Sequence, residues 1–278
     1  MESLNSATID AIRLLATGDS ELWGIIAISF RVSTTAVLIA IPPSLLLAFM
    51  LANGRFPGRR LLISVFSTLL SLPAVVVGLT LYLVLSRQGP LGDLRLLFTQ
   101  SAMVLGQIAL CVPILVAMGH SAFQAADRRA WETARTLGAS PLRALLTVMH
   151  EVRFGLFAVL LAAYGRIIAE VGASMMLGGN ILNYTRNIPT AIALETSKGE
   201  FSQGIALGIV LLLLAFGLNG LLHYFQGMKL AEIAETLGKK LSSVKVQIHR
   251  ARKSLRLVLD DLIETPQASP PAAKRETG

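Results

Sequence analysis

The chain has 278 residues, 53% of them apolar and 15% charged, and its formal net charge is +8. Soluble globular domains carry about 25% charged residues, so this composition excludes an ordinary soluble domain and indicates a membrane protein. The chain has a single cysteine, Cys111, and no G-x-x-x-x-G-K-[ST], H-E-x-x-H or G-x-S-x-G motif; we therefore expect no disulfide, no Cys-based metal site, no cofactor and no enzyme activity.

Five segments have the length and apolar character needed to cross a hydrocarbon core of about 30 Å. They are residues 22–52, 61–86, 100–124, 154–178 and 201–225. Residues 1–21 carry five charges and lack an apolar h-region, so no cleavable signal peptide is predicted. Because a lone strand could not satisfy its backbone hydrogen bonds in lipid, we predict an all-α fold, a polytopic membrane bundle of about five transmembrane helices.

Basic residues are concentrated in two of the loops between these segments. Residues 53–60 contain three arginines and no acid, and residues 127–153 contain five arginines. Cytoplasmic loops carry an excess of Lys and Arg, so both loops are predicted to be cytoplasmic. The N-terminus is then outside and the C-terminus inside a bacterial or archaeal cytoplasmic membrane.

Four prolines lie within the predicted spans. They are Pro42, Pro43, Pro73 and Pro113. Each removes a backbone hydrogen bond and can kink its helix, so we expect bends at these positions.

The third loop, residues 127–153, is too long for a tight connection and predicts a helix, a turn and a second helix. Gly138 suits the end of the first helix, and Ser140 suits the N-cap of the second, which would begin at Pro141. Such an amphipathic element can bind a partner protein or lie among lipid headgroups. Its position between the third and fourth spans, on the predicted cytoplasmic side, favours the partner.

Within this loop, Glu132, Ala134 and Gly138 resemble the E-A-A-x-x-x-G coupling segment of permeases from binding-protein-dependent ABC importers; Thr133 replaces one alanine of that pattern. The resemblance implies a type I importer permease. In that family the short helix docks into a groove on a cytoplasmic ABC ATPase subunit, so that closure of the ATPase dimer moves the spans as rigid bodies.

The predicted fourth span contains two charges. Arg166 and Glu170 are four residues apart, a spacing that places them on one face of a helix and allows them to pair. Charges in lipid are costly and face the bundle interior or a polar cavity. Two interpretations stay open, a structural ion pair and a position on the translocation pathway.

Residues 166–199 resemble the oxyanion branch of these permeases, which handles molybdate, tungstate and sulfate, and residues 83–107 resemble the tungstate type. The resemblance covers residues 21–227 and implies a permease domain of residues 1–227. It further implies import of an oxyanion, with tungstate as the expected anion. The implied partners are an ATPase subunit that hydrolyses ATP, an extracytoplasmic oxyanion-binding protein, a second permease copy in a homodimer, and membrane lipid.

Residues 228–262 are charged and helix-favouring, and residues 263–278 form a Pro, Ala and Ser tail predicted to be disordered. The first of these segments resembles the last two helices of sigma-factor region 4, a helix-turn-helix. That resemblance implies nucleic-acid contacts from Lys245, His249, Arg250, Arg252 and Lys253. The helices that would complete the core are missing, which disfavours DNA binding. A membrane-anchored DNA-binding regulator, a basic helix on anionic lipid and an incidental fusion remain alternatives.

Overall fold

The computed structural model describes residues 4–126 and 128–236, and in this part of the chain it has α-helices, one 3-10 helix at Gly92–Leu94 and no β-strand. The predicted nucleic-acid residues and the predicted tail, residues 263–278, lie outside the described residues. Residues 1–222 form one compact unit, and the chain from His223 onward forms a second. The α-helices are α1 (Leu4–Thr17), α2 (Ser20–Asn53), α3 (Arg59–Leu69), α4 (Ala74–Leu85), α5 (Gln100–Gln124), α6 (Arg128–Thr136), α7 (Pro141–Glu151), α8 (Arg153–Ile168), α9 (Gly172–Gly178), α10 (Ile188–Lys198) and α11 (Phe201–Thr236).

Three helices are long and apolar enough to cross a membrane: α2, α5, and the part of α11 from Phe201 to Leu221. Two further pairs qualify when each is taken as one bent span. The pair of α3 and α4 is bent by 102°, and the pair of α7 and α8 by 78°. The described residues thus provide three to five spans, and the predicted all-α membrane bundle is confirmed.

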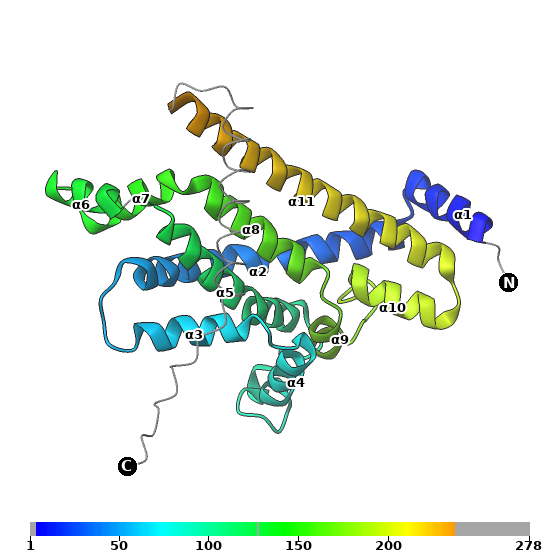
Figure 1. Cartoon of the computed structure of the whole chain (residues 1–278). Coiled ribbons are helices and arrows are strands. Elements are labelled where there is room, and N and C mark those ends of the chain that lie inside the picture. Colours follow the sequence, from blue (N-terminus) through cyan, green and yellow to red (C-terminus); the bar gives the residue numbers. More distant parts are fainter. Residues whose placement is uncertain (1–3, 127, 237–278) are drawn as a thin grey trace, which may run out of the picture. The chain divides into compact units, whose positions relative to one another are not determined.

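Helices α2 and α5 lie side by side at the centre of the first unit (Figure 1). Small residues let them approach closely: a Cβ atom added at Gly119 would lie 3.1 Å from the Cβ of Ala48. Both helices stay continuous through their internal prolines. The core around them buries Ala36, Cys111 and Ile167, the last of which belongs to α8. Close contact between small side chains is the usual basis of helix association in lipid, where apolar burial gives no driving force.

Two of the five predicted spans are not single helices, and here the sequence prediction was wrong in detail. The segment 61–86 is divided between α3 and α4, and Pro73 is the N-cap of α4. Proline cannot donate a backbone hydrogen bond and disfavours helical geometry in the residue before it, so the expected kink is a complete break. The segment 154–178 is divided between α8 and α9.

The two half-helices α4 and α9 pack against each other with glycine in the contact. A Cβ atom at Gly78 would lie 2.9 Å from the Cα of Ala173, and one at Gly172 would lie 2.6 Å from a methyl group of Val75. Both distances are shorter than real Cβ contacts allow. The two breaks in the bundle are therefore neighbours in space.

This contact gives a testable prediction. Gly78→Ala should destabilise the protein by about 1–3 kcal/mol, because the added methyl group meets backbone rather than a side chain that can move. A lower thermal unfolding temperature in detergent would show this. Gly208→Ala in α11 is the matched control, because nothing lies within 4 Å of the added atom. Equal unfolding temperatures for the two variants would contradict the close packing of α4 on α9.

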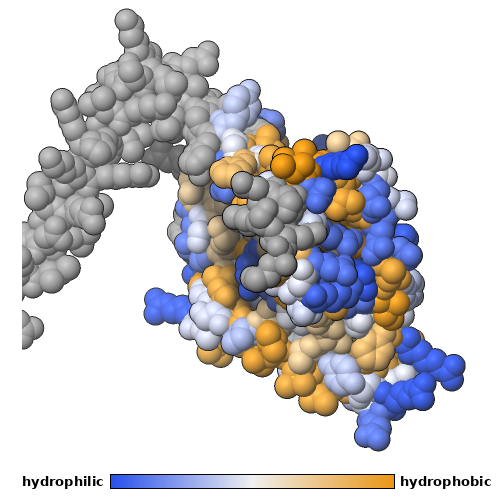
Figure 2. Space-filling view, turned by 90° about the vertical axis from the view of Figure 1, so that its right-hand side faces the viewer, coloured by the Kyte–Doolittle hydropathy of each residue, from blue (hydrophilic) through white to orange (hydrophobic). Residues whose placement is uncertain are grey.

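The end of the bundle opposite α6 and α7 carries α1 and α10 (Figure 1). Helix α1 was not expected from the sequence; its Ala11 is buried in a cluster with Ile188 and Ala206. The backbone N–H of Ile188 donates to the Ser29 hydroxyl of α2 at 2.7 Å. Seen face-on, this end has many hydrophilic residues on its surface (Figure 2), as expected where a membrane protein meets water.

Candidate functional site

The loop between the third and fourth predicted spans has the expected helix, turn and helix. Helix α6 ends at Thr136, and Gly138 follows with φ of 86°, a left-handed conformation that favours glycine. The Ala139 N–H donates back to the carbonyl of Ala134 at 3.0 Å, which closes the end of the helix. The Ser140 hydroxyl accepts from the backbone of the next helix, α7, whose first residue is proline. Local sequence signals thus set this geometry.

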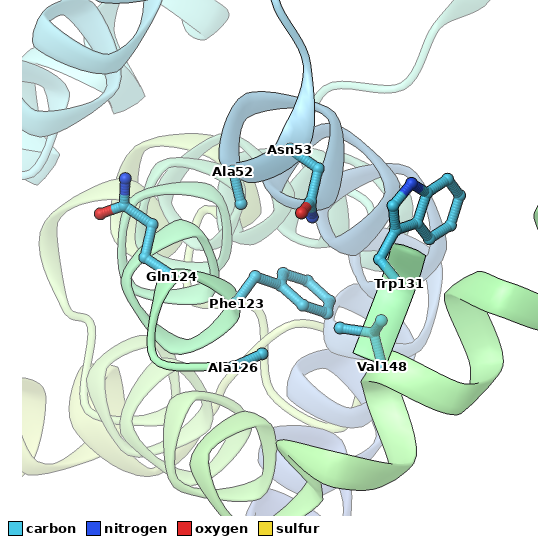
Figure 3. Close-up of a pocket in the computed structure, with 7 residues that line it drawn as sticks. All are labelled: Ala52, Asn53, Phe123, Gln124, Ala126, Trp131 and Val148. Atoms are coloured by element: carbon cyan, nitrogen blue, oxygen red, sulfur yellow. The ribbon is translucent and has the colours of Figure 1, made fainter. Parts of the chain in front are cut away.

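The element is anchored to the bundle through an aromatic cluster. The ring of Trp131 in α6 lies 5.1 Å from that of Phe49 in α2, and Phe49 lies 5.4 Å from Phe123 in α5. Val148 of α7 is buried in the same cluster. A cavity of about 180 Å³ lies between these helices (Figure 3), lined by Ala52, Asn53, Phe123, Gln124, Ala126, Trp131 and Val148. The anchoring role of Trp131 was not predicted. The only indication in the sequence was a large aromatic residue in an otherwise basic loop.

The outer side of the element is apolar and uncovered. Leu137 has 82% of its surface exposed, Leu142 65% and Leu146 55%. Glu132 of α6 is also exposed, and the space around the position of a Cβ atom at Gly138 is open. Exposed apolar residues grouped on one surface mark a site of association with another molecule. The three residues predicted for coupling therefore belong to an element that presents leucines outward.

Arg166 and Glu170 are paired, but they are not on one helix face as the sequence predicted. Helix α8 ends at Ile168, and Glu170 lies in the break before α9. Its carboxylate accepts from Arg166 Nη1 at 2.7 Å and from the backbone N–H of Gly172 at 2.9 Å. The Arg166 side chain is 49% exposed and that of Glu170 only 8%. The Glu170 carboxylate thus accepts hydrogen bonds both from Arg166 and from the backbone of the first turn of α9.

The break in this span also uses a buried amide from the neighbouring helix. Gln107 of α5 is 1% exposed, and its Nε2 donates to the carbonyl of Ile167 at 3.4 Å. The same carbonyl also accepts from the backbone N–H of Glu170 at 3.2 Å. The Gln107 side chain therefore adds a second donor, contributed by α5, at the end of α8.

A second group of charged residues, whose ion pairs were not predicted, lies near α10. Glu195 is 1% exposed, and its Oε1 lies 3.0 Å from Lys198 Nζ and 3.9 Å from Arg186 Nη1. The same guanidinium atom is 3.5 Å from Glu21 at the start of α2. These contacts connect the beginning of α2 with α10. Their effect is to hold the two elements together at this end of the bundle.

Sequence similarity to several membrane permease proteins extends over most of this chain. It is 41% identical over 213 residues to the tungstate uptake system permease protein TupB of Campylobacter jejuni, covering 77% of this chain and 89% of that protein. It is 42% identical to a probable anion ABC transporter permease protein of Haloferax volcanii, over 75% and 93% of the two chains. The molybdenum transport system permease protein ModB of Escherichia coli is 31% identical, over 69% and 91%.

The fold has a counterpart among solved structures. The inward-facing MetNI methionine ABC transporter matches with a TM-score of 0.54 and 14% identity, over 74% of this chain and 94% of that chain.

The C-terminal part of the chain matches a different family: residues 221–255 match the family model described as Sigma-70, region 4. The helical membrane fold and the relatives together define a multi-pass membrane transport subunit. Within this class, the chain belongs to the family of permease subunits of ABC transporters.

Proposed function

We propose that this chain is the permease subunit of an ABC importer that carries tungstate across the cytoplasmic membrane. The observation that carries the proposal is the exposed element formed by α6, Gly138 and α7, joined to the bundle through Trp131. An apolar surface mounted rigidly on the ends of two spans can transmit the movement of a bound partner to them. The anion is inferred from the tungstate uptake permeases of C. jejuni and Peptoclostridium acidaminophilum, which are 41% and 36% identical.

The proposed partner at this element is a cytoplasmic ATPase subunit, with Glu132, Ala134 and Gly138 in its contact. An extracytoplasmic oxyanion-binding protein would deliver the anion at the other end. We further propose a homodimer of permeases in membrane lipid, because each chain offers one such element and paired ATPases need two. The arginine-rich loops support a cytoplasmic position for the element, with the N-terminus outside and the C-terminus inside.

The proposed permease domain is residues 1–227, with the coupling loop at residues 127–153, followed by the helix-turn-helix-like segment 228–262 and the tail 263–278. Helix α11 continues from Phe201 to Thr236 across the first of these boundaries. The alternative function, a membrane-anchored DNA-binding regulator, is not favoured, because the relatives are transport subunits over most of the chain.

Deleting residues 228–278 distinguishes the two functions. We expect tungstate uptake to stay near its normal rate, because the similarity to permeases lies in the membrane part of the chain. The measurement is tungstate accumulation in cells that lack the native gene and carry either the full or the shortened chain. Loss of uptake with normal membrane insertion would make the C-terminal segment part of the transporter. Uptake that is absent with the full chain as well, while a tungstate permease such as TupB restores it, would overturn the proposed substrate.

A further inference from the structure

A single charge interrupts the apolar part of α2. Arg31 is the only charged residue between Glu21 and Arg55, and the 21 residues from 32 to 52 carry none. At 1.5 Å per residue this uncharged stretch is about 31 Å long, which matches a hydrocarbon core of about 30 Å. At its far end, Arg59 donates to the carbonyls of Leu51 and Ala52. A hydrocarbon core that extends along α2 from the level of Arg31 to the level of Arg59 would match this length.

Arg31 lies at one end of a groove of about 500 Å³ between α2 and α5. Near Arg31 the groove is lined by the polar side chains of Thr35, Gln100 and Ser101, together with Val32 and Leu96. One and two turns further along the same helix faces it is lined by Ile39, Leu105 and Ile108. Helices α2 and α5 run in the same direction, as the pairing of Phe49 with Phe123 near both helix ends shows. The groove is thus polar at the bilayer boundary and apolar toward the bilayer interior.

Arg31 has no counterion among the residues that the structure describes. Across residues 4–126 and 128–236, no hydrogen bond or ion pair of Arg31 is found, and its side chain is exposed. A guanidinium at the boundary of the hydrocarbon core is attracted to anionic headgroups. Its planar donors suit the oxygens of a phosphate group. The polar end of the groove therefore fits a tetrahedral oxyanion.

We propose that this groove binds an anionic phospholipid. Its phosphate pairs with Arg31 and accepts hydrogen bonds from the hydroxyls of Thr35 and Ser101, and one acyl chain lies along Ile39 and Leu105. A free oxyanion could make the same polar contacts with Arg31 as a lipid phosphate. It would make no favourable contact with the apolar part of the groove, whereas an acyl chain would. The headgroup of an anionic lipid carries the charge opposite to that of the arginine.

Native mass spectrometry of the full chain tests the proposal, with phosphatidylglycerol and phosphatidylcholine of identical acyl chains as probes. We expect phosphatidylglycerol to be retained preferentially. Arg31→Gln should weaken its retention by about tenfold, the usual effect of losing a charge-assisted hydrogen bond. Arg87→Gln, an exposed arginine outside the groove, should have no effect. Ser101→Trp, which fills the groove and keeps the arginine, should also reduce retention.

Several outcomes would overturn the proposal. Equal retention of the two lipids would contradict the proposed site. So would Arg31→Gln and Ser101→Trp chains that bind phosphatidylglycerol as tightly as the unmodified chain. Displacement of the lipid by millimolar tungstate would assign Arg31 to the transported anion. Disulfide formation between two chains carrying Ser101→Cys in native membranes would show that a second copy covers the groove. Cys111 is buried and does not compete in that reaction.

Discussion

Replacing Gly138 by aspartate is expected to abolish tungstate uptake while the chain still inserts in the membrane. Residue 138 has φ of 86°, a conformation that costs a residue with a Cβ atom about 1–2 kcal/mol. The turn would therefore shift, and the new carboxylate would lie beside the exposed Leu137. Because the proposed ATPase surface includes this turn, association with the ATPase and uptake should fall together. Co-purification of the ATPase with the tagged permease, measured alongside uptake, checks both.

Gly58→Asp is the matched control for this experiment. Gly58 has φ of 83° and, like Gly138, nothing within 4 Å of the position of a Cβ atom. It lies before α3, outside the element formed by α6 and α7, so its backbone cost is the same but the coupling surface is unchanged. We expect the Gly58 variant to keep the ATPase bound. If Gly138→Asp retains both normal ATPase association and normal uptake, the coupling assignment is wrong.

The second large effect is expected at Glu170. Glu170→Ala should destabilise the protein by about 2–4 kcal/mol, because it leaves Arg166 without its partner in the membrane and the Gly172 N–H without its acceptor. Arg166→Ala should cost less, since Glu170 would still accept from Gly172. Thermal unfolding of the purified variants in detergent gives the two values.

Two further variants separate the charge from the hydrogen bond. Glu170→Gln keeps an acceptor for the Gly172 N–H and removes the charge, so it should retain more stability than Glu170→Ala. The double variant Arg166→Ala, Glu170→Ala should recover part of the loss, because it removes the unpaired cation, but the first turn of α9 stays without its acceptor. Strictly additive losses for the two single variants would show that the side chains do not act as a pair.

The sequence by itself determined the class of the fold and the helix, turn and helix of the proposed coupling element. Apolar length and clustered charge suffice to recognise a helical membrane protein, because segments in lipid must satisfy their backbone hydrogen bonds internally. The turn at Gly138 and the cap at Ser140 were predicted correctly because both depend on residues within one turn of each other. The family assignment followed from motifs in the same local stretches.

Only the tertiary structure decided where the spans are broken and what the breaks do. Apolarity is the same for a straight and a bent helix, so hydropathy could not show that α8 ends at Ile168 or that Glu170 serves α9. The support from Gln107 and the anchoring by Trp131 come from residues distant in the sequence. The groove beside Arg31 likewise needs α2 and α5 together. Local signals specify helices and turns, whereas breaks and grooves are set by long-range contacts that satisfy backbone and charged groups away from water.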